Sequence, residues 1–391
     1  MKSCVHSIAL FLALTGTVWL CRTSSAAPLV APGDVFGWGY NYQGQTTIPP
    51  QATNVVAISA GSGWNIALRL DGQVICWGDN GLGQITGVPT SGQPQVGSPP
   101  GLNDIVAVSA GGVHNLALRS NGTVFAWGHS GSGQTTIPAG LNNVTAISAG
   151  GAHSAAVRQD GRVIAWGENF AGQCNIPANL NTAMAVSCGN NHTLILKSDG
   201  TVMGLGANDF GQRNIPAGLS NVVEISAGNN HSMALRLDGR VVVWGANESG
   251  QTNVPVGVTN IIAVAAGNNS YCLALRADGM VLGWGSDGGG QATFPSGVFG
   301  VTAIAAGGVH SLCILASQTA AGPASLGINA YPGISLTGSI GATYRIEFST
   351  ELGPAAQWQP LTNFTLFTVP QAFVDWSAVG SPRRFYRAVA P

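Results

Sequence analysis

The stretch Asn221–Gln251, NVVEISAGNNHSMALRLDGRVVVWGANESGQ, contains one complete unit of a pattern that recurs along the chain. It holds three short runs rich in apolar and β-branched residues, which favour β-strands. Asn229-Asn230 separates the first two runs, and Asp238-Gly239 separates the second from the third, a strong signal for a tight hairpin. Because no helical period occurs in the stretch, we predict a small antiparallel sheet of three or four strands.

A Trp-Gly pair ends the third run, and it recurs at a period of about 40 residues, once as Leu-Gly. Gly-Gln follows each pair six residues later, so the loops between them have one length. The seven positions are Trp38, Trp77, Trp127, Trp166, Leu205, Trp244 and Trp284. A fixed period of this size indicates an array of identical β units. Seven such units that close on themselves form a β-propeller.

The two ends of the array complete each other. Val35–Trp38 is a third run that lacks the runs before it, and His310–Leu315 is a second run that lacks the third run after it. Pairing these two segments closes the ring and removes two exposed sheet edges. The predicted fold class is therefore all-β: a seven-bladed β-propeller closed by its N- and C-terminal strands.

The tryptophan and histidine residues of the repeat are predicted to be structural. The strands are apolar on both faces, which fits blades packed between neighbouring blades, and the indoles should fill those interfaces. One imidazole recurs where the second run begins, and Trp64 and Tyr271 take that place in two repeats. We expect a packing ring in which each imidazole bonds nearby backbone, and not a metal site. These structural residues are Trp38, Trp77, Trp127, Trp166, Trp244, Trp284, His114, His153, His192, His231 and His310.

The bulk composition and the N-terminus narrow the class of protein. Only 8% of the 391 residues are charged and the net charge is −1, so nucleic-acid binding lacks its electrostatic driving force. Lys2, the apolar run Ile8–Leu20 and the small residues Ser25–Ala27 are typical of a secretory signal peptide. We expect a secreted or cell-surface protein, cleaved near Ala27, with no membrane span.

The predicted domains are a signal peptide (1–27), the propeller (28–316), a linker (317–325) and a C-terminal β-sandwich-like module (326–391).

The chain shows no pattern typical of an enzyme or a metal site. The cysteines beyond the predicted signal peptide have no CxxC spacing, and the carboxylates are scattered or belong to hairpin turns. Gly128–Ser132, GHSGS, lacks the final glycine of a nucleophile elbow. We therefore predict no catalytic residue, no metal and no cofactor. The second repeat has an 11-residue excess around Pro89–Pro100, which we interpret as a surface insertion.

The repeat resembles that of the regulator of chromosome condensation family. The stretch Ala149–Gln173 contains nearly the whole pattern: Ala-Gly-Gly-Ala-His153, then Gly161-Arg-Val163, then Trp166-Gly-Glu-Asn-Phe-Ala-Gly-Gln173. The resemblance covers about residues 33–316. Its short 39-residue period is similar to the bacterial branch, which includes a secreted propeller that inhibits β-lactamases. The best-known eukaryotic member is a nuclear exchange factor for a small GTPase.

We predict an exported, non-enzymatic binding scaffold, a monomeric propeller that holds variable loops on two faces. The partner is expected to be a protein or a surface glycan. The candidate contact residues are Tyr40, Tyr42, Phe170, Phe210, Trp64, Asn191, Asn230 and Asn269. The alternatives left open are an inhibitor of a β-lactamase-like enzyme, a regulator resembling a guanine-nucleotide exchange factor, and a hydrolase at the central channel.

Overall fold

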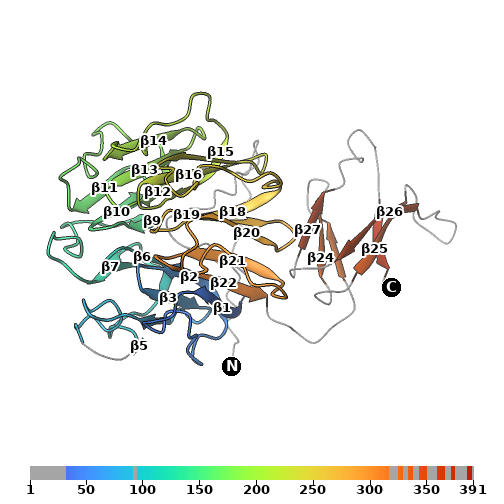
Figure 1. Ribbon diagram of the computed structural model, residues 1–391, viewed down its shortest axis with the longest axis horizontal. Coiled ribbons are helices and arrows are strands. Elements are labelled where there is room, and N and C mark those ends of the chain that lie inside the picture. The colour runs from blue at the N-terminus through green and yellow to red at the C-terminus, as the bar shows by residue number, and fades with distance from the viewer. Residues whose placement is uncertain are drawn as a thin grey trace, which may run out of the picture.

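The computed structural model describes residues 32–90 and 95–316 and, beyond them, only strands between residues 325 and 389. Within these residues every regular element is a β-strand (Figure 1). The predicted all-β fold class is confirmed.

Each repeat forms a blade of three antiparallel strands, ordered from the centre of the ring outwards. The innermost strands are β2 (Val55–Ala60), β6 (Ile105–Ala110), β9 (Val144–Ala149), β12 (Ala183–Cys188), β15 (Val222–Ala227), β18 (Ile261–Ala266) and β21 (Val301–Ala306). The middle strands are β3 (Trp64–Arg69), β7 (His114–Arg119), β10 (His153–Arg158), β13 (His192–Lys197), β16 (His231–Arg236), β19 (Tyr271–Arg276) and β22 (His310–Ala316). The outer strands are β4 (Val74–Gly78), β8 (Val124–Gly128), β11 (Val163–Gly167), β14 (Val202–Gly206), β17 (Val241–Gly245), β20 (Val281–Gly285) and β1 (Gly33–Gly39).

The N- and C-terminal strands of the propeller pair and close the ring. β1 runs antiparallel to β22 from the pair Gly33 and Ala316 to the pair Gly39 and His310. β22 pairs on its other side with β21, so the last blade takes two strands from one end of the array and one from the other. β2 of the first blade contacts β21 and β22 of this last blade. The predicted circular closure is confirmed.

The hydrophobic core is divided among the interfaces between blades. One cluster joins Leu116 of β7 to Ile147 of β9 and Trp166 of β11. The indole of each Trp-Gly pair lies, like Trp166, in a cluster shared with the preceding blade. The predicted packing of these indoles between blades is therefore confirmed. Each blade depends on its neighbours, because truncating a buried tryptophan costs about 3–5 kcal/mol.

The insertion in the second repeat is more than a surface loop. Its residues Gln95–Gly97 form β5, which pairs antiparallel with β4 and places Val96 opposite Trp77. β4 is an edge strand without it, and an unpaired edge offers backbone groups to any nearby extended segment. Residues 91–94 of the insertion lie outside the described residues.

The C-terminal part contains two three-stranded sheets, in accord with a small β module. One sheet consists of β23 (Ser325–Ile328), β24 (Gly333–Thr337) and β27 (Gln371–Val374). The other consists of β25 (Thr343–Ser349), β26 (Gln359–Thr365) and β28 (Phe385–Val389). The predicted signal peptide and most of the predicted linker lie outside the described residues.

Candidate binding face

Two kinds of loop meet at one end of the blades. One joins an innermost strand to a middle strand, and the other follows Trp-Gly. In each blade the residue after Trp-Gly donates its backbone N–H to the carbonyl just before the histidine position, as Glu168 does to Ala152 at 2.9 Å. We call this end the loop face, and the opposite end, which carries the Asp-Gly turns, the hairpin face. The expectation of variable loops on two faces is corrected: both kinds lie on one.

The Trp-Gly loops are held in shape by their own recurring side chains. In the loop after β11, Asn169 Oδ1 accepts the backbone N–H of Cys174 at 2.8 Å, and its Nδ2 donates to Asn175 Oδ1. The buried Gln173 accepts the N–H of Ala171 at 3.0 Å. Asn41, Asn208 and Asn247 make the same bonds in their loops. The side chains of the two residues after the asparagine make none of these recurring hydrogen bonds, so the residue types at these positions are free to vary.

The predicted aromatic contact residues occupy these exposed positions. Phe170 and Tyr42 follow the asparagine directly and are 95% and 83% exposed, while Phe210 stands one place later and is 46% exposed. Tyr40 follows Trp-Gly, and its ring stacks on that of Tyr42 with centroids 6.3 Å apart. Large aromatic side chains held in the open by a rigid loop are suited to bury area against a partner.

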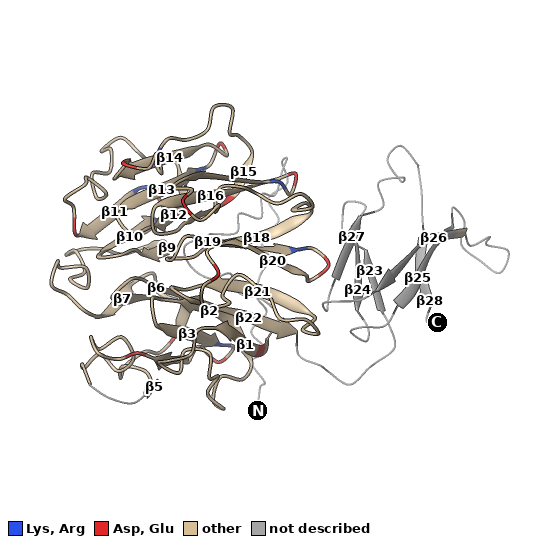
Figure 2. Ribbon diagram, viewed as in Figure 1, with Lys and Arg blue, Asp and Glu red and all other residues tan. Residues whose placement is uncertain are grey.

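Carboxylates accompany the aromatic residues on three successive loops. Glu168 lies beside Phe170, Asp209 beside Phe210, and Glu248 on the next loop. Arg213 is exposed on the same loop as Phe210 and donates to the carbonyl of Gly206 at 3.2 Å. Figure 2 shows Lys and Arg near the hairpin end of strands such as β20, and Asp and Glu at both ends of the blades. The sector formed by Glu168, Phe170, Asp209, Phe210 and Glu248 thus combines apolar and anionic groups; we call it the aromatic sector.

The other predicted contact residues differ among themselves. Trp64 was predicted to contact a partner, and this is wrong: its side chain is only 2% exposed, and its Nε1 donates to Asn115 Oδ1 of the next blade at 2.7 Å. Asn191 and Asn230 are half-buried on the loop face, where their carbonyls accept the N–H groups of Ala207 and Ala246. Asn269 is exposed there.

The histidines link neighbouring blades through side chains. His153 Nε2 lies 2.9 Å from Thr193 Oγ1, which donates in turn to the carbonyl of Gln173 at 2.9 Å. Because the hydroxyl proton is used there, the Nε2 of His153 must carry a proton and donate. His114, His192 and His310 bond Ser154, Ser232 and Asn65 of the next blade in the same way. The expectation of bonds to nearby backbone is corrected, since the partners are side chains one blade away.

The backbone carbonyls of the Gly-Gln glutamines, which accept these hydroxyl protons, also accept the indole N–H groups of the Trp-Gly pairs. Trp166 Nε1 donates to Gln134 O at 2.9 Å, and the hydroxyl of Ser154 donates to that oxygen at 2.8 Å. A carbonyl has two lone pairs, so it satisfies both donors. Each Trp-Gly loop is thereby joined, through its glutamine, to the core of the next blade.

Burial keeps these imidazoles neutral. It lowers the pKa of His114 and His192 to about 3 and that of His153 and His310 to about 4, from 6.5. The neighbouring imidazoles lower the pKa of His114 and His192 further. A neutral imidazole with one N–H suits the single donor bond that each makes.

One of these hydrogen bonds from a histidine to the next blade is missing. At the position where other blades have a hydroxyl or amide, the β18–β20 blade has Cys272, and His231 Nε2 makes no hydrogen bond with it. The backbone of Tyr271 raises the pKa of His231 slightly against the larger effect of burial, which lowers it to about 4. The Cys272 thiol itself lies 3.4 Å from the carbonyl of Gln251. A buried donor without a good acceptor weakens this interface.

Cys272→Ser is expected to stabilise the propeller by about 1 kcal/mol, because the serine hydroxyl can accept from His231 and donate to Gln251, as Ser232 does for His192 and Gln212. Urea unfolding measures the effect. Cys313→Ser is the matched control: Cys313 is fully buried in an apolar cluster, so its new hydroxyl should cost about 1–3 kcal/mol. If Cys272→Ser loses as much stability as the control, the claim that His231 lacks an acceptor at position 272 is contradicted.

The central channel is lined by small residues of the innermost strands and has a volume of about 140 Å³. Its serines are structural: Ser148 Oγ accepts the N–H of Cys188 in the next blade at 2.9 Å, and Ser59, Ser109, Ser187 and Ser226 do the same. Among the described lining residues Glu224 is the one carboxylate, and no imidazole accompanies it.

The described residues contain no group of three or more His, Cys, Asp or Glu side chains that could hold a metal ion. Cys76, Cys174, Cys188, Cys272 and Cys313 are free thiols. In the part of the chain that the structure describes, no helix is long and apolar enough to cross a membrane.

A ring of antiparallel blades closed by its terminal strands defines a β-propeller, here with the Trp-Gly loops and the loops before the histidine position on one face. Within that class the chain belongs to the regulator of chromosome condensation (RCC1) repeat family. The RCC1 repeat matches residues 55–84, 105–134, 144–173, 185–212, 222–251 and 261–291. The predicted family resemblance is thus confirmed. No curated protein matches the chain.

Several solved structures share this fold. Prp20p of Saccharomyces cerevisiae has a TM-score of 0.65 at 20% identity, over 75% of this chain and 94% of Prp20p. Human WBSCR16 has a TM-score of 0.57 at 17% identity, over 72% of this chain and all of that chain. The ectodomain of the receptor kinase CR4 of Physcomitrella patens has a TM-score of 0.53 at 19% identity, over 83% of this chain and 96% of that one. Identities this low show the fold alone.

Proposed function

We propose that this chain is an exported, non-enzymatic scaffold that binds a partner through its loop face. The observation that carries the proposal is the aromatic sector, where Phe170 is 95% exposed on a loop fixed by its own hydrogen bonds. A fixed loop loses little conformational entropy on binding, so less of the free energy gained by burying its phenylalanine is offset by the cost of ordering the loop.

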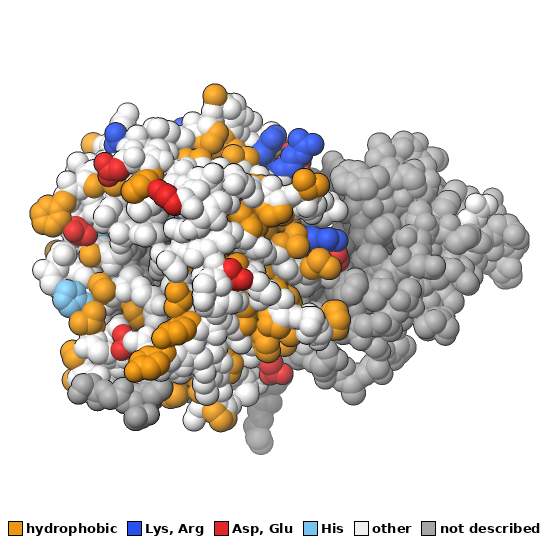
Figure 3. Space-filling view, in the orientation of Figure 1, with side chains coloured by type: hydrophobic (Ala, Val, Ile, Leu, Met, Phe, Trp, Pro, Cys, Tyr) orange, Lys and Arg blue, Asp and Glu red, His pale blue; other side chains and the backbone are white. Residues whose placement is uncertain are grey.

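A protein is the partner that the chemistry of this face favours, with a surface glycan as the second candidate. Hot spots of protein interfaces are typically aromatic residues surrounded by polar ones. Figure 3 shows hydrophobic and acidic side chains close together at the left edge of the molecule, where the loop face is seen edge-on. The three carboxylates outnumber Arg213, the one exposed cation of the three described loops that carry the aromatic sector, and favour a partner surface that carries Lys or Arg. Prp20p has binding properties toward Gsp1p and histones, and yeast RCC1 binds Kap60, which supports protein binding by this kind of propeller.

The proposal is tested by mutating the aromatic sector and comparing partner capture. Full-length protein is used to recover crosslinked partners from surface and secreted fractions. The double variant Phe170→Ser and Phe210→Ser is expected to weaken the recovered partner's affinity about 30-fold or more. This corresponds to a total loss of about 2 kcal/mol of binding free energy, the amount that defines a hot spot. Raising the salt concentration should weaken binding of the unmodified protein as well.

The matched control changes another exposed phenylalanine, which lies on the other face. Phe299→Asn should leave affinity unchanged, because Phe299 lies on the hairpin face. Loss of binding in Phe299→Asn and its retention in the loop variant would show that the face is misassigned. Inhibition of a β-lactamase, nucleotide exchange on a GTPase and hydrolysis stay predictions that the same purified proteins can test.

A further inference from the structure

The chain leaves the propeller on the hairpin face, beside an exposed phenylalanine. β22 ends there at Ala316, whose backbone N–H donates to the carbonyl of Gly300 at 2.8 Å. Gly300 directly precedes β21, and its neighbour Phe299 is 63% exposed. Ala316, the last described residue before the linker, is therefore hydrogen-bonded to the residue that follows Phe299.

Further exposed apolar residues lie on the hairpin face around this exit. Val256 precedes β18 and is fully exposed, and Met280 follows the turn between β19 and β20. Leu70 occupies the hairpin of the β2–β4 blade, which adjoins the exit blade, and Leu237 occupies that of the β15–β17 blade, two blades away on the other side. We call these five residues, Leu70, Leu237, Val256, Met280 and Phe299, the exit patch. The hairpins of the β9–β11 and β12–β14 blades, across the ring from the exit, carry the exposed polar residues Gln159 and Ser198 in the place of Leu237.

The chain's other repeats show that the fold does not require apolar residues at these positions. The position of Phe299 is held elsewhere by Thr53, Asn103, Asn142, Asn181, Ser220 and Thr259. The position of Met280 is held elsewhere by Gln73, Thr123, Arg162, Thr201 and Arg240. Polar residues thus support the same turns, and the apolar exceptions are concentrated where the chain leaves. An exposed apolar patch of this kind marks a contact surface.

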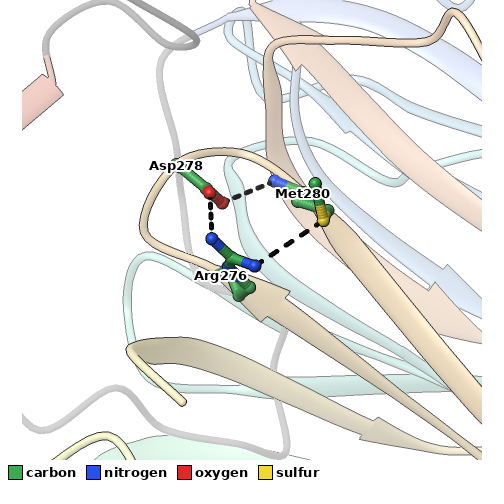
Figure 4. Close-up of polar contacts among 3 residues, drawn as sticks. All are labelled: Arg276, Asp278 and Met280. Carbon is green, nitrogen blue, oxygen red and sulfur yellow. Dashed lines mark hydrogen bonds and ion pairs between the residues drawn. The ribbon is translucent and has the colours of Figure 1, made fainter. Parts of the chain in front are cut away.

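The Met280 side chain is held in place at the turn and not drawn into the core. Its backbone N–H donates to Asp278 Oδ1 at 3.2 Å, and Arg276 Nη1 lies 3.8 Å from its sulfur while pairing with Asp278 (Figure 4). In other blades the hairpin glycine contacts the start of the next innermost strand, as Gly239 O accepts the N–H of Ile261. Met280 lies in the β19–β20 hairpin and Phe299 lies just before β21 of the next blade, so both belong to the hairpin face of adjacent blades.

We propose that the exit patch is the docking surface for the C-terminal module of the same chain. Ala316 and the first strand of the module, at Ser325, are separated by the eight residues 317–324, which span at most about 30 Å. The module therefore cannot reach far from the patch. It consists of two sheets whose strands have four to seven residues, and a unit of about 60 residues buries too little surface to be very stable alone. Apolar contact with the exit patch supplies the burial that it lacks.

The test uses the full chain with substitutions taken from its own repeats. Val256→Ala, Met280→Thr and Phe299→Asn together place at each position a residue that another blade tolerates there. Elastase, which cuts after small residues, is expected to cleave the linker about tenfold faster or more in this variant, because cleavage follows the population of the undocked state. After cleavage the module should stay with the propeller on gel filtration for the original protein and separate for the variant.

Phe170→Ser is the control for a general effect of removing an exposed phenylalanine, since Phe170 lies on the loop face. It should change neither cleavage nor co-elution. Equal cleavage rates and equal co-elution in the original protein and the triple variant overturn the proposal. So does a dimer mass for the original protein that the triple variant reduces to a monomer, because the patch would then bind a second copy. Unchanged tryptophan fluorescence in the triple variant shows that its propeller has folded.

Discussion

Lowering the pH from 7 to 5 is expected to remove about 2 kcal/mol of unfolding free energy for each of the five buried histidines. Their folded-state pKa values of about 3 to 4 lie below the ordinary value of 6.5. Below pH 6.5 the unfolded chain therefore binds protons at these histidines, while the folded chain does not. The stability contributed by these groups is present above pH 6.5 and is lost as the pH falls toward the folded-state pKa values. The sum approaches the total stability of a typical domain, about 5–15 kcal/mol.

Urea unfolding at pH 7, 6 and 5 measures this dependence. His192→Gln is the matched variant, because its amide can still donate to Ser232 while one titrating group is gone. Its loss between pH 7 and 5 should be about 2 kcal/mol smaller than that of the original protein. A stability that stays level over this range, or a variant with the same slope, contradicts neutral buried imidazoles.

Removal of β1 is expected to abolish the cooperative unfolding of the propeller. A chain that begins at Gln43 lacks the strand that pairs along the whole length of β22, and it loses Trp38, which is buried against the preceding blade. The loss of this indole alone costs about 3–5 kcal/mol. It also leaves β22 as an unpaired edge, which favours association with other chains. Circular dichroism during heating, together with the molar mass in solution, measures the result.

A chain that begins at Pro28 is the control, since it keeps β1 whole. It should unfold in one transition like the full chain. A β1-less chain that still unfolds cooperatively as a monomer would show that the ring does not depend on its closing strand.

The sequence predicts the blades and the closure of the ring because each repeat has the same strand spacing and the ends complement each other. The position of the loops was also readable: two strands separate the His-side loop from the Trp-Gly loop, so both must emerge at one end. Trp64 was misassigned because tryptophan is a residue type common in contact surfaces. It takes the place of a buried histidine and is itself buried. Its exchange for histidine in other repeats was the available signal.

Other features depend on tertiary contacts that spacing does not encode. β5 forms only because the edge of β4 is open beside the insertion, and a three-residue strand has no detectable alternation of its own. The bond of His153 to Thr193 depends on how one blade packs on the next. The exit patch was missed because Phe299 and Met280 interrupt no motif, and they become meaningful only once the chain exit lies beside them.

Ring closure is the claim on which the shared loop face and the chain exit both depend, and an engineered crosslink tests it most directly. Phe36 lies opposite Cys313 in the β1–β22 pair. In Phe36→Cys, mild oxidation should join residues 36 and 313 within one chain, which mass spectrometry of the digested protein detects, and it should raise stability by about 5 kcal/mol in the loop-entropy estimate. Phe36→Cys combined with Cys313→Ser should form no such link. A cysteine at position 36 that stays free, or that joins another cysteine instead, contradicts the closed ring.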